Sequence, residues 1–432
     1  MPRRDSDPIV ISGIGVVSPF GAGRDRFWSS IRAGESGVRA ITDFDVSRYS
    51  CRVAAAVPDA DPEDPGEDAG PQSPATEAGG DGGTSRADPR RYSKASRIAV
   101  QAAREAWADA GLNGVDRTAG VIVGSGAGGV DVAERQYREF FSDALNRVSP
   151  YAIPVSIVGM ISSEISIALG LHGISHVLST GCTSSTDAVS YAASLIRSGE
   201  ADVLVTGGAD ACVTSGMIFG FSRMRAVSTA YNEAPSRASR PFDRGRDGFV
   251  LGEGAWMFVL ERQSRARARG AAPYASVDGY GSTCDAYHRV QMDPDGTEIV
   301  RAMTLAIERS GRSIDEIGYI NYHGTSTQLN DAVEARCVRA LLGDRAERVP
   351  GSSTKSMIGH PQGASGAAGL AATALALRHR FLPPTINQDD PDPQCGLDFI
   401  ANRGRDVEIE AALCNCLGFG SKNSAIVLGR VE

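Results

Sequence analysis

The stretch HVLSTGCTSSTDAVSYAASLIRSG, residues 176–199, predicts a strand, a tight turn and a helix in close succession. The apolar strand leads into the turn Thr180-Gly181, and a helical pattern begins near Ser184. Cys182 therefore lies at the start of the helix, whose partial positive end favours a thiolate and predicts a lowered thiol pKa. A free cysteine is more often a buried, inert side chain. Position alone thus leaves a nucleophile and a core residue as equal alternatives.

Similar strand, turn and helix units recur along the chain. The apolar runs are rich in Val and Ile and are continuous rather than alternating, as in strands buried on both faces. Because helical patterns lie between them, the sequence predicts a layered α/β fold. The expected strands are Ile9–Val16, Val121–Val123, Val177–Ser179, Val203–Val205, Trp256–Leu260, Tyr319–Tyr322 and Ala425–Leu428, and the expected helices are Arg97–Ala110, Asp187–Ser198, Asp331–Leu342 and Gly366–Arg378.

Residues 58–89 differ from the rest of the chain in composition. The segment has almost no large apolar side chains and is rich in Pro, Gly and acidic residues. Because it cannot bury enough surface to offset its ordering entropy, we expect a mobile surface insertion. An acidic docking segment is the weaker alternative.

Composition argues against several classes of protein. With a net charge of −8 and no dense basic block, the chain is not expected to bind nucleic acid. Its apolar runs are too short to span a membrane, and its N-terminus lacks a signal sequence, so a cytoplasmic location is expected. There the eight cysteines should be reduced thiols. Cys414 and Cys416 match zinc-site spacing poorly, so no metal site is expected.

The histidines favour catalysis at Cys182. The chain has only six histidines, and two of them lie in turns rich in Gly, Ser and Thr. His323 lies in NYHGTST, residues 321–327, and His360 ends STKSMIGH, residues 353–360. A lone histidine in a turn is usually a solvated surface group. Two such turns together with a cysteine at a helix start predict a Cys-His-His constellation.

Six motifs give the chain a family resemblance. The chain resembles β-ketoacyl-acyl-carrier-protein synthases of the type II elongating class, including the ketosynthase subunits of type II polyketide synthases, towards which the resemblance leans. It runs from Ile9 almost to the C-terminus, apart from the insertion. The motifs, in the order of the family, are STGCTSSTDAV around Cys182, RPFDRGRDGFVLGEGA at 240–255, DAYHRVQMDPDG at 285–296, NYHGTSTQLNDAVEA at 321–335, STKSMIGH at 353–360 and NCLGFGSKNSAIVL at 415–428.

The resemblance implies a fold and a reaction. The fold is thiolase-like, with five αβαβα layers built from two duplicated halves, residues 1–270 with the cysteine and residues 271–432 with both histidines. Cys182 accepts the acyl chain, and His323 and His360 assist loss of CO₂ from malonyl-acyl-carrier protein. The enolate then attacks the acyl-cysteine in a decarboxylative Claisen condensation. No bound cofactor is implied, because the substrates are carried on the phosphopantetheine of acyl carrier protein.

The resemblance also implies supporting residues and partners. The expected dimer is either a homodimer or a heterodimer with a chain-length-factor-like subunit. Acyl carrier protein is the expected substrate-bearing partner, and because it is acidic it requires a local basic patch. The implied roles are catalytic support for Lys355 and Glu334, an oxyanion hole of Cys182 and Phe419 with Phe419 as gate, phosphopantetheine contacts for Thr325 and Thr327, an acyl pocket with Phe221 and Phe249, and carrier docking for Arg90, Arg91 and Lys94.

Three positions depart from the family pattern. Gly369 stands where most elongating synthases have a Glu. Leu417 replaces an aromatic residue two positions before Phe419, which is expected to reshape the pocket mouth. Ser421 replaces the last glycine of the usual GFGG gate, which is expected to stiffen it.

Other functions remain alternatives. The run GSGAGG at 124–129 follows a strand and formally fits the dinucleotide motif, with Asp143 at about the right spacing, so a nicotinamide oxidoreductase is one. A chain-length-factor subunit is another, although it would lack the nucleophile that Cys182 supplies. A synthase-like acyltransferase that loads without condensing, and a housekeeping fatty-acid synthase, are also left open by the triad.

Overall fold

The computed structural model describes residues 6–58 and 92–431. The expected insertion therefore lies almost entirely outside the described residues. All seven expected strands and all four expected helices are present in the described part, most of them longer than predicted. The described strands join into one eleven-stranded mixed sheet with two halves, and two two-stranded sheets lie apart from it.

The first half of the sheet has the order β6-β5-β7-β8-β1. The three strands at its outer end, β6, β5 and β7, are parallel, whereas β8 runs antiparallel to both β7 and β1. The bounds are β1 Ile9–Ser18, β5 Gly120–Gly124, β6 Ser175–Leu178, β7 Val203–Ala211 and β8 Glu253–Arg262; the short β2, Gly21–Ala22, pairs with β1.

The second half repeats that order as β11-β10-β14-β15-β9. Again the first three strands are parallel, and β15 is antiparallel to both β14 and β9. A short pairing between β1 and β9 joins the halves. The bounds are β9 Ala275–Cys284, β10 Ile317–Asn321, β11 Gly351–Ser352, β14 Ala411–Gly418 and β15 Lys422–Gly429. Identical order and direction in both halves are what a duplicated unit produces.

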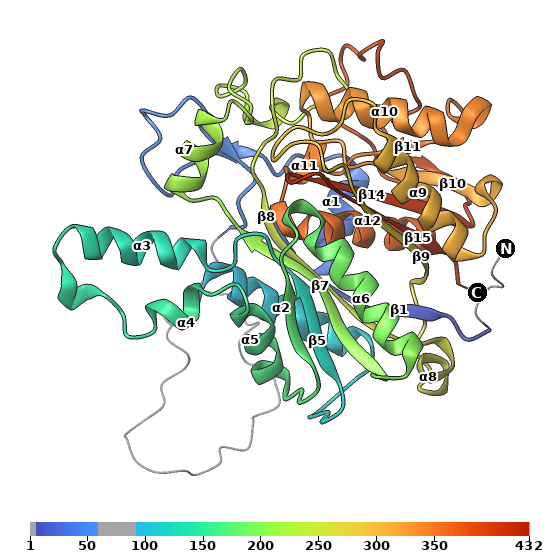
Figure 1. The fold of residues 1–432 in the computed structure, drawn as a ribbon, viewed down its shortest axis with the longest axis horizontal. Coiled ribbons are helices and arrows are strands. Elements are labelled where there is room, and N and C mark those ends of the chain that lie inside the picture. The colour runs from blue at the N-terminus through green and yellow to red at the C-terminus, as the bar shows by residue number, and fades with distance from the viewer. Residues whose placement is uncertain (1–5, 59–91, 432) are drawn as a thin grey trace.

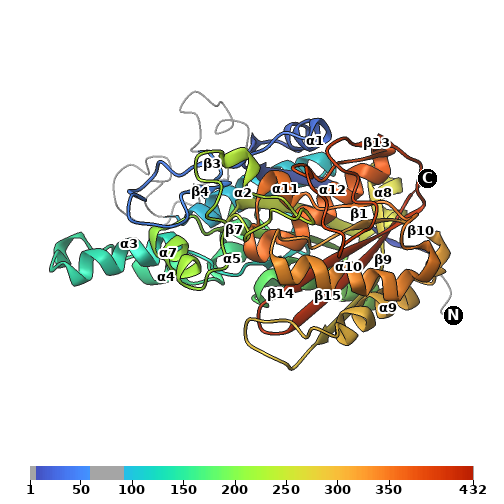
Figure 2. The same ribbon diagram turned by 90° about the horizontal axis from the view of Figure 1, so that it is seen from above.

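Helices separate the two half-sheets into layers (Figures 1 and 2). Helices α2 and α5 pack on the outer face of the first half, and α9 and α10 lie on the outer side of the second. Helices α6 and α12 contact each other and strands of both halves, so they form the middle layer of an αβαβα arrangement. The bounds are α2 Lys94–Asp109, α5 Met160–Leu169, α6 Ser184–Ser198, α9 Thr297–Ser310, α10 Gln328–Leu342 and α12 Ser365–His379.

Matching glycines let one helix approach each half-sheet closely. A Cβ on Gly13 or Gly15 of β1 would come within 2.1 Å of backbone oxygens in α2. A Cβ on Gly279 or Gly281 of β9 would come equally close to α9. In both strands the first glycine is the fifth residue, and both helices present alanines, so each half uses the same close strand–helix packing.

Further elements decorate this core. Helices α3 and α4 extend away from the body in Figure 1, and α3 carries the exposed aromatic side chains of Tyr137, Phe140 and Phe141. Among the described residues, no helix is both long and apolar enough to cross a membrane. The remaining bounds are α1 Arg24–Ala33, β3 Arg39–Ala40, β4 Val53–Ala54, α3 Val130–Phe141, α4 Ala152–Ser156, α7 Ser215–Arg223, α8 Gln263–Ala268, α11 Lys355–Ile358, β12 Phe381–Leu382 and β13 Arg405–Asp406.

Candidate active site

Cys182 lies in a single 3₁₀ turn, Gly181–Thr183, immediately before α6. Its side chain is buried in the middle layer. The carboxylate of Asp187 braces the turn by accepting hydrogen bonds from the hydroxyls of Thr180 at 2.5 Å and Thr183 at 3.2 Å. The sequence therefore placed the cysteine correctly at a helix start.

The expected low thiol pKa is wrong for the free enzyme. Burial is the largest influence and raises the pKa of Cys182 to about 11, despite the neighbouring Lys355 cation. Two backbone N–H groups, those of Cys182 and Phe419, point at the sulfur and favour its charged form. Desolvation outweighs these donors because the thiol is fully buried. The same two donors form the pair expected for an oxyanion hole.

The two predicted histidines meet at this site. His323 follows β10, His360 follows α11, and both are buried. Their ring centroids are 5.3 Å apart and the rings are nearly perpendicular. Burial and the charge of Lys355 hold the pKa of both imidazoles well below the usual range. Both rings are therefore neutral near pH 7 and can donate one N–H each.

Glu334 orders the first histidine turn. Its carboxylate accepts the backbone N–H of His323 at 2.7 Å and that of Gly324 at 2.8 Å, and also the side-chain amide of Asn415 at 3.2 Å. Burial raises the pKa of Glu334 to about 7. The charge of Lys355 acts electrostatically on Glu334 and lowers the pKa of its carboxyl group. Burial in turn lowers the pKa of Lys355. The carboxylate thus acts on the loop backbone.

Thr325 and Thr327 lie side by side at the start of α10. Their hydroxyl oxygens are 3.0 Å apart. Asp331 fixes the strand-to-helix loop because it accepts the backbone N–H of Thr325 at 3.0 Å and that of Phe242 at 2.9 Å. This buried carboxylate was not singled out from the sequence, although it falls within the motif at 321–335.

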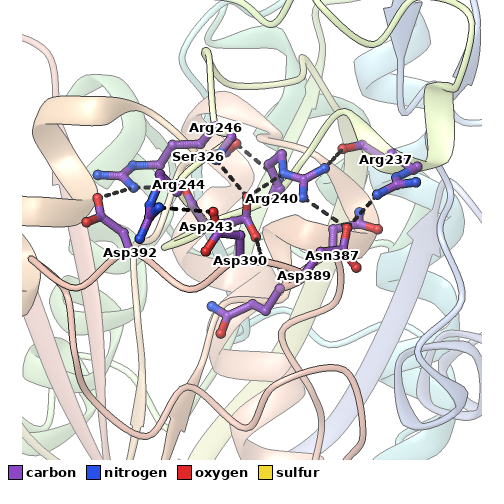
Figure 3. A network of polar contacts seen from close by, with 12 residues as sticks. Arg237, Arg240, Asp243, Arg244, Arg246, Ser326, Asn387, Asp389, Asp390 and Asp392 are labelled. Atoms are coloured by element: carbon purple, nitrogen blue, oxygen red, sulfur yellow. Dashed lines mark hydrogen bonds and ion pairs between the residues drawn. The ribbon is translucent and has the colours of Figure 1, made fainter.

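A network of arginines and carboxylates holds the same loop from the other side (Figure 3). Arg240 donates to Asp243 at 2.9 Å and to Asp389 at 3.0 Å. Its backbone N–H donates to the hydroxyl of Ser326, a residue with a left-handed φ of 70°. The network therefore ties the motif at 240–255 to the loop that follows His323 and to the segment at 387–392.

Two predicted pocket residues stack beside the second histidine. The ring of Phe249 contacts that of His360 edge to face at 5.5 Å, and Phe221 contacts Phe249 at 5.2 Å. These aromatic rings form an apolar wall next to the imidazole.

The segment after β14 carries the gate candidate. Phe419 is 37% exposed, whereas its N–H faces the buried sulfur of Cys182. Ser421 adopts a left-handed φ of 64°, and its hydroxyl donates to the carbonyl of His288 at 2.9 Å. The serine therefore ties the gate to the loop at 285–290. His288 itself caps a turn, because its Nδ1 accepts the N–H groups of Val290 and Gln291.

The other two departures lie in packed surroundings. A Cβ on Gly369 would lie 2.5 Å from Oδ1 of Asn321, so a larger residue here requires the Asn321 side chain to move. Leu417 is 3% exposed and belongs to the core of the second half. The expectation that Leu417 shapes the pocket mouth stays a prediction, because Cys182 and both histidines are buried to a similar degree.

The predicted docking residues must be revised. Arg90 and Arg91 lie outside the described residues. Lys94 forms an ion pair at 2.6 Å with Glu253, a carboxylate that is almost fully buried, and also donates to the carbonyl of Val57. Because its ammonium is held by an interior carboxylate, we remove Lys94 from the docking prediction.

The glycine-rich loop at 124–129 does not present free donors to a dinucleotide. The buried carboxylate of Asp210 accepts the backbone N–H groups of Gly126 at 2.8 Å and Ala127 at 3.1 Å, and the hydroxyl of Ser125 at 2.7 Å. A pyrophosphate needs those N–H groups. Within residues 6–58 and 92–431, no cluster of three or more metal-ligating side chains could hold an ion.

Comparison with known proteins agrees with this site. The family model described as Beta-ketoacyl synthase, N-terminal domain, matches residues 6–266, and the corresponding C-terminal domain matches residues 274–389. The 3-oxoacyl-[acyl-carrier-protein] synthase 2 of Coxiella burnetii is 38% identical over 98% of both chains. The tetracenomycin polyketide synthase ketoacyl synthase alpha subunit of Streptomyces glaucescens is 40% identical over 100% of this chain and 99% of that protein.

A solved structure has the same fold over its whole length. The ishigamide ketosynthase/chain length factor superposes with a TM-score of 0.87 at 32% identity and covers 100% of both chains. These matches extend over both halves of the chain. The chain therefore belongs to the β-ketoacyl synthase family, and it is a ketosynthase that condenses acyl and malonyl units in fatty-acid or polyketide elongation.

Proposed function

We propose that Cys182 is the residue that carries the acyl chain during this condensation. The observation that carries the proposal is the pair of backbone N–H groups, from Cys182 and Phe419, that face the sulfur. When the thiolate attacks a thioester, the negative charge on the carbonyl oxygen develops next to the attacked carbon. Two fixed donors in a buried site stabilise that oxyanion without reorganisation.

Loading breaks the thioester bond to the phosphopantetheine sulfur and forms one to Cys182, and the proton lost by the Cys182 thiol ends on the departing phosphopantetheine thiolate. Because burial raises the pKa of Cys182 to about 11, the resting group is a neutral thiol. The cation of Lys355 and the two N–H donors favour the thiolate, so they lower the cost of forming it. The buried thiol is thereby protected from solvent until an acyl thioester enters.

His323 and His360 serve the malonyl step. Loss of CO₂ leaves an enolate whose oxygen needs hydrogen-bond donors. Two neutral, nearly perpendicular imidazoles 5.3 Å apart can both donate to one oxygen between them. Because their pKa values are depressed, no proton needs to leave either ring near pH 7. The carbanion end of the enolate then attacks the acyl-cysteine.

The remaining residues hold the substrates in place. The adjacent hydroxyls of Thr325 and Thr327 suit the amides of a phosphopantetheine arm on acyl carrier protein. Phe221 and Phe249 suit the start of the acyl chain. Lys355 and Glu334 support the histidines by charge and by hydrogen bonds to the loop backbone.

We infer that the product is a polyketide rather than a fatty acid, with a chain-length-factor-like subunit as partner. The tetracenomycin alpha subunit and the ishigamide ketosynthase/chain length factor support this choice. The exposed aromatic side chains of α3, including Phe140 and Phe141, suit burial by a second subunit. Fatty-acid elongation by a homodimer is the alternative, and the similarity to the 3-oxoacyl-[acyl-carrier-protein] synthase 2 of Coxiella burnetii leaves it open. Native mass spectrometry of the chain expressed alone distinguishes them: a catalytically active homodimer contradicts the heterodimer.

Arg90 and Arg91 remain the predicted carrier-docking residues. The double variant Arg90→Glu with Arg91→Glu is expected to raise the apparent KM for acyl-carrier protein while kcat is retained, since reversed charges repel an acidic partner. An unchanged KM contradicts the docking role.

Intact-mass analysis tests the whole proposal. Wild-type protein incubated with a panel of acyl-carrier proteins should gain the acyl mass, whereas Cys182→Ala should not. Addition of malonyl-carrier protein should then release an elongated β-ketoacyl product. Acyl mass on Cys182→Ala would contradict the nucleophile assignment. Loading without elongation would identify an acyltransferase instead of a condensing enzyme.

A further inference from the structure

An open cavity of about 650 Å³ lies at the seam of the two halves. Its lining residues include the second half of α6, the middle of β9 and the C-terminal end of α9. Cys182 precedes α6, whereas the cavity begins at Ser190 and includes Arg197. A helix rises about 1.5 Å per residue, so Ser190, the first residue of α6 in the lining, lies about 9 Å from the helix start at Ser184. Neither Cys182 nor either active-site histidine lines the cavity. The cavity is therefore separate from the condensation site.

Arginine dominates the charge of this cavity. The lining includes five arginines and a single acidic residue, Asp278. That carboxylate is already paired with the buried Arg312 at 2.6 Å. The arginines are Arg197, Arg267, Arg309, Arg312 and Arg430.

Two of these guanidinium groups have no carboxylate partner among the described residues. Arg430 pairs with Glu408 and Glu410 outside the cavity. In contrast, Arg197 forms no described ion pair, and Arg309 donates only to the carbonyl of Tyr280 at 3.0 Å. Counting the described residues alone, the cavity therefore carries positive charge from both halves that no carboxylate compensates.

Helix stabilisation does not account for this arrangement. Arg197 and Arg309 lie in the last turns of α6 and α9, where a cation offsets the partial negative charge of the helix end. Each helix end carries roughly half an elementary charge, so the two ends together offset only one of the two unpaired arginines. The remaining positive charge lies where the ends of α6 and α9, which belong to different halves, line the same cavity.

We propose that this cavity binds a small organic polyphosphate of nucleotide size. A guanidinium group presents a planar fork that matches phosphate oxygens, and charge-assisted hydrogen bonds of this kind are strong. Two unpaired forks from different helices suit two phosphate groups better than one. A volume of about 650 Å³ lies within the range of pockets that hold nucleotide-sized ligands.

Isothermal titration calorimetry of the full-length protein tests the proposal with ADP and AMP as probes. At about 150 mM salt, ADP should bind at one site, and AMP should bind at least roughly tenfold more weakly because it lacks the second phosphate. Arg197→Ala and Arg309→Ala should each weaken ADP binding by about tenfold or more. Both side chains are exposed, so the variants should fold, which circular dichroism checks.

Two controls separate this cavity from other sites. Arg104→Ala removes an exposed arginine on α2, outside the cavity lining, and should leave ADP affinity unchanged. Cys182→Ala should also leave it unchanged, because the condensation site is not involved. No binding of ADP to wild type, equal affinity for ADP and AMP, or full affinity in the two arginine variants would each overturn the proposal.

Discussion

The turns Gly181–Thr183 and Gln362–Ala364 occupy corresponding places in the two halves of the molecule. Each is a three-residue 3₁₀ turn followed at once by a fifteen-residue helix, α6 or α12. The two helix starts touch, since the N–H of Ala367 donates to the hydroxyl of Ser185 at 2.9 Å. The corresponding helix starts of the two halves are therefore in contact at the centre of the fold.

The middle residue of each turn differs. The first turn has Cys182, whereas the second has Gly363 in the same place. A Cβ on Gly363 would lie 2.2 Å from the backbone nitrogen of Gly126, and its N–H donates to Asp210 at 2.6 Å. The second helix start is thus closed by packing, while its half supplies His323 and His360 from loops. The two halves have equivalent backbone arrangements at these turns. The space around the middle residue of each turn determines which turn can hold a reactive side chain.

Replacing Cys182 with glycine should have the largest effect, because it makes the first turn resemble the second. Without a thiol, no acyl-enzyme can form, so condensation should fall by roughly a thousandfold or more. Product formation measured with acyl- and malonyl-carrier proteins checks this. Condensation at a rate near that of wild type would show that another residue carries the acyl chain.

Gly363→Ala tests whether tight packing closes the second turn. The added methyl group collides with backbone on the neighbouring loop, so the free energy of unfolding should fall by about 3 kcal/mol. Urea denaturation measures the change. The matched control is Gly220→Ala in α7, where a Cβ meets nothing within 4 Å and no loss of stability is expected. Equal behaviour of the two variants would contradict the packing argument.

Asp210→Asn tests whether the carboxylate of Asp210 connects the two helix starts. One oxygen of this carboxylate accepts N–H groups from Gly126 and Gly363, and an amide NH₂ there would face donors, which should cost about 2 kcal/mol of stability. The negative charge of Asp210 also raises the pKa of Cys182. Its removal should therefore speed alkylation of Cys182 at pH 8. Unchanged stability together with unchanged alkylation would rule out this link.

The pH dependence of Cys182 alkylation tests the burial argument. Because burial raises the thiol pKa to about 11, the thiolate fraction should grow about tenfold per pH unit from pH 7 to 9.5. Iodoacetamide labelling followed by peptide mass analysis measures the rate. A Cys284→Ser background removes the exposed thiol. A plateau below pH 8 would instead indicate a thiolate activated by the helix.

Ser421→Gly should have the smallest effect. It concerns the predicted gate at Phe419, which lies beside the first turn and not beside the second. The change removes the hydrogen bond that the hydroxyl donates to the carbonyl of His288 and the two that it accepts from the backbone N–H groups of Tyr287 and His288. It also relieves a left-handed φ, so stability should fall by at most about 1 kcal/mol. Hydrogen exchange at the Gly420 amide should become faster because the loop is less tied. Slower or unchanged exchange would show that the serine does not stiffen the gate.

Much of the fold could be predicted from local patterns. The continuous Val and Ile runs became β1, β5, β7 and the other expected strands, because buried strands require apolar residues on both faces. The paired glycines at matching positions of β1 and β9 are a further sign of the repeat that is visible in the sequence. Gly369 and Leu417 could not be interpreted in the same way, since their neighbours come from distant segments.

The sequence by itself determined which residues could perform the chemistry: one cysteine at a helix start, two histidines in hydroxyl-rich turns, and the motifs around them. Only the tertiary structure decided their properties. Burial made Cys182 a neutral thiol and both histidines neutral donors, because desolvation depends on everything packed around a group and not on its neighbours in the chain. The tertiary structure also pairs Lys94 with Glu253 and brings Arg197 and Arg309 to one cavity.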